Sequence, residues 1–111
     1  MPSPVEIKIF NSLAMSASKT SDKVEMLYLE KGAIQLVWSG ADTAVGKVYV
    51  EISCEPMALN FVTIPKGEIN IATASGTALA QMPDICYRWM RLRYEPGSNT
   101  AGSISAYAVF K

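Results

Sequence analysis

The sequence contains no histidine. Histidine is the commonest general base in proteins, a frequent metal ligand, and the partner that activates most serine and cysteine nucleophiles. The carboxylates do not replace it, because none of their spacings indicates two acids held together in a cleft, as a glycosidase requires. We therefore expect a protein without enzymatic activity.

An excess of charge of one sign is also missing. The 111 residues include 10 Lys and Arg and 10 Asp and Glu, so the net charge is zero. A neutral chain has no bulk attraction for nucleic acid or for an anionic membrane. No apolar run is long enough to span a bilayer, and the first residues do not resemble a secretory signal. We expect neither a nucleic-acid partner nor a membrane anchor, and synthesis in a cytoplasm.

Cysteine is scarce, with only Cys54 and Cys86 in the chain. A zinc site needs about four ligands at close spacing, and no such cluster accompanies these thiols. No glycine-rich phosphate loop and no dense acidic calcium loop is present. The sequence therefore predicts no metal and no cofactor. We expect the two cysteines to be small buried hydrophobes, with a single disulfide between them as the alternative.

What the sequence does contain is a repeated alternation of apolar and polar residues, which is typical of half-buried strands. The ranges that alternate most clearly are 5–10, 33–39, 47–54, 86–94 and 103–110. Weaker segments are predicted as short strands at 60–64 and 68–72, as a strand or short helix at 24–30, and as at most one helical turn or a loop at 76–84. Turns rich in Gly and Pro separate them. This pattern predicts an all-β fold, an antiparallel β-sandwich or jelly roll of seven to eight strands.

The length fits one domain. We assign residues 22–111 to the β-sandwich. Residues 1–21 are either an N-terminal arm that pairs with a neighbouring subunit or the first strand and loop of the same domain.

Aromatic and arginine residues gather on one side of the strand predicted at 86–94. Alternation places Met90, Leu92 and Tyr94 on the core face, and the opposite face then carries Tyr87, Trp89, Arg91 and Arg93. Together with Tyr49 these are the predicted interface or ligand platform, because aromatic and Arg side chains are enriched at protein interfaces and stacking surfaces. The structural alternative is that Trp89 covers the sheet edge and the arginines pair with Glu51 or Glu55.

Several segments resemble small bacteriophage virion β-sandwich proteins. Residues 34–41 (IQLVWSGA) resemble their first strand, of the type S-I-Q-x-V-W-S-G, and residues 87–94 (YRWMRLRY) resemble a later strand of the type Y-R-W/Y-x-R-L/V-x-Y. Residues 46–53 and 102–106 extend the resemblance. The chain departs from it after Ser53, where the family has an Asn/Asp-rich turn. The 87–94 strand is also similar, over a short stretch, to the closing strand of discoidin-type carbohydrate-binding sandwiches.

The resemblance implies a structural protein of the virion, either a capsid decoration or a component of a spike or tail. Its partners would be further copies of itself, in a homotrimer or a capsid-bound multimer, and phage capsid or tail proteins. The alternative is a carbohydrate-binding module or host-adhesion domain. A host surface glycan would then stack on Trp89, Tyr87, Tyr49 or Trp38.

Overall fold

The computed structural model describes residues 4–43 and 45–111. Met1 to Ser3 of the predicted N-terminal segment and Ala44, in the turn predicted between 33–39 and 47–54, lie outside the described residues. The described residues form nine strands: β1 (Val5–Ala14), β2 (Lys19–Thr20), β3 (Val24–Glu25), β4 (Gly32–Ser39), β5 (Lys47–Ser53), β6 (Val62–Asn70), β7 (Gly76–Met82), β8 (Trp89–Glu95) and β9 (Ser103–Phe110). They contain no helix that is long and apolar enough to cross a membrane.

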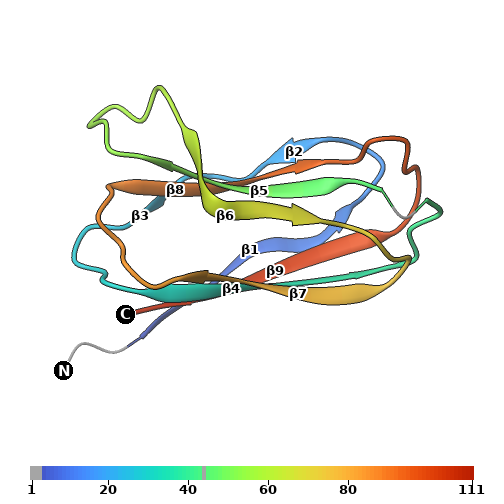
Figure 1. Cartoon of the computed structure of the whole chain (residues 1–111), viewed down its shortest axis with the longest axis horizontal. Helices are drawn as coiled ribbons and strands as arrows, with labels where there is room; N and C mark the ends of the chain where they lie inside the picture. Colours follow the sequence, from blue (N-terminus) through green and yellow to red (C-terminus); the bar gives the residue numbers. More distant parts are fainter. Residues whose placement is uncertain (1–3, 44) are drawn as a thin grey trace.

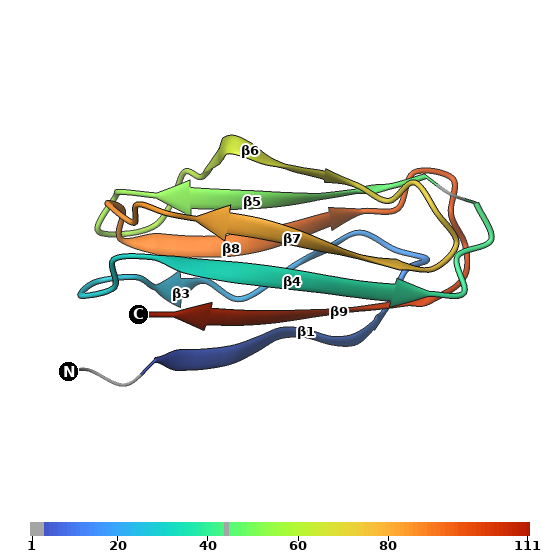
Figure 2. The same cartoon turned by 60° about the horizontal axis from the view of Figure 1, so that its bottom comes forward.

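The strands form two antiparallel sheets that face each other (Figure 1). The first sheet has the order β1-β9-β4-β7, and the second has the order β2-β8-β5-β6, with β3 also paired to β8. Figure 2 shows the first sheet from its outer side, with β7 and β1 at its two edges. The predicted all-β sandwich is therefore confirmed.

The inner faces of both sheets form one hydrophobic core. In β4 the alternation places Ile34, Leu36 and Trp38 inward. Burial of a large apolar side chain stabilises a fold by about 1.5–3 kcal/mol. In β8 the inward row is the predicted one, and its members are completely buried: Met90, Leu92 and Tyr94.

Two segments of the second half differ from the prediction. Residues 76–84 are not a helical turn, since β7 forms a regular strand against β4. Its alanines favour a helix locally, but pairing with β4 and the burial of Ala80 and Met82 decide the outcome. Residues 60–64 and 68–72 belong to one strand rather than two. A register shift between Thr63 and Glu68, a stretch in which Lys66 has a positive φ, replaces the expected turn.

The N-terminal segment is part of the first sheet in this chain. β1 pairs with β9 over ten residues, longer than the alternation at 5–10 predicted, with register shifts on both sides of Phe10. At 24–30 only the two-residue β3 forms, followed by a turn.

Candidate functional site

The centre of the second sheet brings four of the five predicted platform residues together on its outer face: Tyr49, Trp89, Arg91 and Arg93. The pairing of β5 with β8 sets Tyr49 opposite Arg93, Glu51 opposite Arg91 and Ser53 opposite Trp89. Directly opposite residues of an antiparallel pair share a face. With Phe61, which precedes β6, they form what we call the arginine–aromatic face: Tyr49, Glu51, Phe61, Trp89, Arg91 and Arg93.

Glu51 is the centre of this face. Its side chain is buried, and its carboxylate accepts hydrogen bonds from Nε of Arg91 at 2.8 Å and from Nε of Arg93 at 3.0 Å. Arg93 also donates to Glu95 at 2.7 Å. The bonds to Glu51 and Glu95 raise the pKa of the Arg93 guanidinium. The arginines thus pair across strands with Glu51, as the structural alternative predicted.

Each of these arginines also lies over an aromatic ring. The Arg91 guanidinium is 3.9 Å from the ring centroid of Phe61, and that of Arg93 is 4.2 Å from the centroid of Tyr49. Such cation–π contacts stabilise the charge and orient the planar guanidinium. A carboxylate and a ring therefore hold each arginine in one orientation. The two side chains remain about a third exposed, at 31% and 32%.

Trp89 lies at one side of the arginine–aromatic face, where β8 begins. Its indole N–H donates to the carbonyl oxygen of Glu55 at 3.1 Å. Two cations approach the ring, Lys23 at 4.8 Å and Arg88 at 5.6 Å from its centroid. The ring is only partly exposed, and the strand pairing and this hydrogen bond fix its position.

The loop between β5 and β6 extends from the same end of the second sheet (Figure 1). We call residues 54–61 the apolar loop, because Met57 is 72% and Leu59 78% exposed. The Glu55 carboxylate accepts hydrogen bonds from the backbone N–H of Asn60 at 2.6 Å and from its side-chain amide at 3.1 Å. These bonds lower the pKa of Glu55 and brace the loop. The hydrogen bonds between Glu55 and Asn60 thus close the turn from which Met57 and Leu59 project into solvent.

Two of the predicted aromatic residues lie elsewhere. Tyr87 is in the irregular segment 83–88 and packs against the core, and burial raises its pKa to about 12. The alternation that placed it beside Trp89 begins only where β8 begins. Trp38 is buried, and its indole N–H donates to the carbonyl oxygen of Thr73 at 3.0 Å. Trp38 is therefore a core residue and offers no surface for a sugar.

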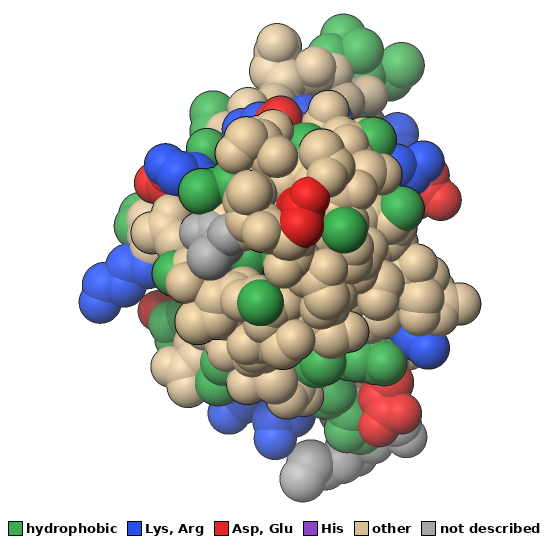
Figure 3. All heavy atoms as spheres, turned by 90° about the vertical axis from the view of Figure 1, so that its right-hand side faces the viewer, with side chains coloured by type: hydrophobic (Ala, Val, Ile, Leu, Met, Phe, Trp, Pro, Cys, Tyr) green, Lys and Arg blue, Asp and Glu red, His purple; other side chains and the backbone are tan. Residues whose placement is uncertain are grey.

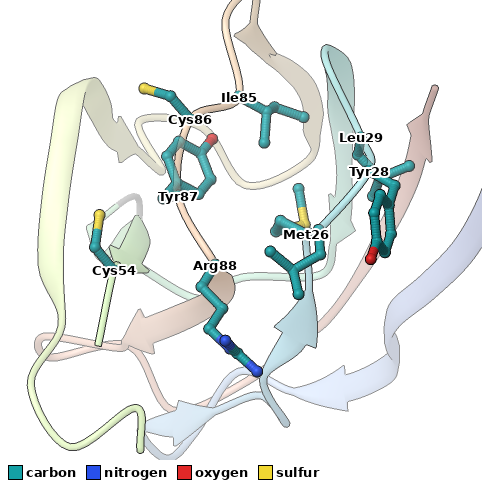
Figure 4. Close-up of a pocket in the computed structure, with 9 residues that line it drawn as sticks. Met26, Tyr28, Leu29, Cys54, Ile85, Cys86, Tyr87 and Arg88 are labelled. Atoms are coloured by element: carbon teal, nitrogen blue, oxygen red, sulfur yellow. The ribbon is translucent and has the colours of Figure 1, made fainter. Parts of the chain in front are cut away.

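The cysteines differ from the prediction too. Cys54 and Cys86 are exposed and free, so they are neither buried hydrophobes nor a disulfide. Both lie outside the strands, where alternation no longer sets which side is buried. They line a shallow recess of about 370 Å³ between residues 26–29 and 85–88, in which Figure 4 shows the two thiols apart from each other. Among the described residues, no three His, Cys, Asp or Glu side chains group as metal ligands.

The opposite end of the sandwich is braced by Asn99, which sequence reasoning missed. Its buried amide oxygen accepts from the backbone N–H groups of Asp42 and Thr43, and its amide nitrogen donates to the carbonyl oxygen of Met15 at 3.1 Å. Asp42 accepts from the side chain and backbone of Thr100, which lowers the Asp42 pKa. Figure 3 shows this end as mostly uncharged, with charged side chains mainly at its rim. It offers no concentrated charge for a ligand.

No protein-family model matches the chain, and no curated protein matches it. The proposed function therefore rests on the chain's own sequence and geometry.

Proposed function

We propose that the chain is a non-enzymatic structural protein of a bacteriophage particle, a capsid decoration or a component of a spike or tail. It binds capsid or tail proteins through the arginine–aromatic face and the apolar loop. The resemblance of its strands to small virion sandwiches supports the setting. The main support for binding through this surface is the Arg91–Glu51–Arg93 cluster, together with the exposed Met57 and Leu59 of the apolar loop.

The chemistry of this surface suits a protein partner. Aromatic residues, Met and Arg are enriched at the centres of protein interfaces. A guanidinium has five N–H donors, and the hydrogen bonds within the described residues use one from Arg91 and two from Arg93. The other donors suit backbone carbonyls or carboxylates of a partner. Because Glu51 already orders both side chains, little rotamer freedom is lost on binding.

A carbohydrate-binding or host-adhesion role is the second candidate. Trp89 favours it, since a partly exposed ring flanked by Arg88 and Lys23 meets the minimum for a sugar platform. The rings of Tyr49 and Phe61 weigh against it. Arg93 and Arg91 already stack on them, so a sugar would have to use the other ring face or displace a cation.

The test is incorporation into particles. Mass spectrometry of purified virions from the source culture should detect the chain in many copies, and gold-labelled antibodies should place it on the head or tail. Purified chain should co-sediment with particles that lack it. Leu59→Ser should weaken this binding about tenfold, the loss expected for one interface anchor. Val109→Ser, at 45% exposure on the first sheet, is the matched control and should not.

Absence from virions together with no co-sedimentation would contradict the proposal. A glycan-array signal that Trp89→Ala abolishes would favour the carbohydrate-binding role instead.

A further inference from the structure

The four lateral edges of the two sheets differ in how open they are to another strand. Edge strands present unpaired backbone N–H and C=O groups, and proteins protect them with charges, prolines, bulges or very short strands. β1 carries Glu6 and Lys8 and has register shifts. β6 contains Pro65 and a register shift, and β2 and β3 have two residues each. Three of the four edges are thus protected.

The fourth edge, β7, has none of these features. It pairs with β4 in unbroken register from Gly76 to Met82, and its sequence, GTALAQM, contains no charge and no proline. Figure 2 shows no strand of the first sheet beyond it. On its outer face Leu79 is 59% exposed. β7 is therefore a regular, uncharged and open edge.

We propose that β7 pairs antiparallel with β7 of a second copy of this chain, which joins the two first sheets into one continuous sheet. An antiparallel pair of identical strands has a two-fold axis. Full overlap of the seven residues places this axis at Leu79, the midpoint of the strand. Leu79 then lies opposite Leu79 of the second copy, and Thr77 lies opposite its Gln81.

The lack of charge on β7 suits a second copy as the occupant. Neither strand contributes a charge to the seam, so no like charges face each other, whereas a charged partner strand would find no complementary group on β7. The cross-strand contacts are of the favourable kinds, an apolar Leu–Leu pair and two Thr–Gln pairs able to hydrogen-bond. The inward residues of β7 are Gly76, Ala78, Ala80 and Met82, and none of them carries a charge.

An apolar recess continues this edge. It has a volume of about 370 Å³, lies between β6 and the end of β7, and is lined by Val62, Ile64 and Met82 among others. A strand added to β7 would cover part of it. This surface is separate from the arginine–aromatic face, so self-pairing does not depend on the proposed role in a particle.

Analytical ultracentrifugation over a wide range of concentration tests the pairing. One strand pair gives an interface at the small end of the stable range, so a dimer with a micromolar dissociation constant is expected. Leu79→Lys sets two like charges face to face and should weaken the dimer at least tenfold. Val109→Lys, on the same outer face but on the interior strand β9, should leave it unchanged.

Two further variants test the register, with circular dichroism confirming that each is folded. Thr77→Glu combined with Gln81→Lys sets opposite charges across the seam and should retain the dimer, whereas Thr77→Glu combined with Gln81→Glu should abolish it. In a Cys54→Ser, Cys86→Ser background, Leu79→Cys should oxidise to a covalent dimer. A chain that stays monomeric at every concentration overturns the proposal. So does an oligomer that survives Leu79→Lys and is lost with Val109→Lys.

Discussion

The outer faces of the two sheets differ in their use of charge. The second sheet carries Arg91 and Arg93 around Glu51, and the Lys47–Glu68 pair beside them at 2.6 Å. In the first sheet β4, β7 and β9 contain no charged residue. Charge pairing fixes side chains and creates a defined surface, whereas three neighbouring strands without charge leave the open backbone edge of β7 as their most specific feature. One fold thus presents two chemically different outer surfaces.

The inner faces of the two sheets are alike, because both contribute apolar side chains to one core. The largest predicted effect tests whether the two sheets contribute equally to stability. Leu36→Ala in the first sheet and Leu92→Ala in the second each remove a completely buried side chain from the common core. Each should lower the free energy of unfolding by about 3 kcal/mol, measured by urea denaturation. A loss below about 1 kcal/mol at either position would show that the core is not shared equally.

The second prediction concerns the charges that distinguish the two outer faces. Glu51→Gln keeps the shape of the side chain but leaves two arginines without their carboxylate. Breaking a buried pair costs about 3–5 kcal/mol, and because the arginines are about a third exposed we expect about 2 kcal/mol. Glu68→Gln breaks the exposed pair with Lys47 and is the control, with a change within about 0.5 kcal/mol in the same urea experiment. Equal losses would mean that Glu51 is no more than a surface charge.

Most of the fold could be predicted because alternation is a local signal. In β4, β5, β8 and β9 each inward residue is apolar, so the strand and its buried face follow from the sequence alone. β7 could not be predicted in this way. Alanine favours a helix locally, and only pairing with the distant β4 makes residues 76–82 a strand.

The candidate site was predicted in part, because alternation places only those side chains that lie on regular strands. Trp89, Arg91 and Arg93 share a face because β8 is regular there, and Tyr49 joins them through the register with β5. Tyr87 was misplaced because the chain bends before β8. The contribution of Phe61 comes from a loop, and alternation carries no information about where a loop side chain lies.

A smaller effect on stability is expected at the end of the sandwich braced by Asn99. There Asp42 accepts hydrogen bonds from Thr100. These bonds lower the Asp42 pKa in the folded state below its ordinary value of 3.8. The stabilisation is therefore present above about pH 4 and is lost as the pH falls through the folded pKa. Melting temperature measured against pH should fall less steeply below pH 4 in Asp42→Asn than in the wild type. Parallel curves would contradict this role of Asp42.

The smallest effect is expected on the outer face of the first sheet. Val37 points outward from β4, opposite Thr77, and is 37% exposed. Val37→Lys should change the free energy of unfolding by less than about 0.5 kcal/mol, because the long side chain extends into solvent. A small change would show that the fold does not depend on the absence of charge from the outer side of β4. A loss of 2 kcal/mol or more in urea denaturation would instead show that the uncharged strands depend on their outer contacts to fold.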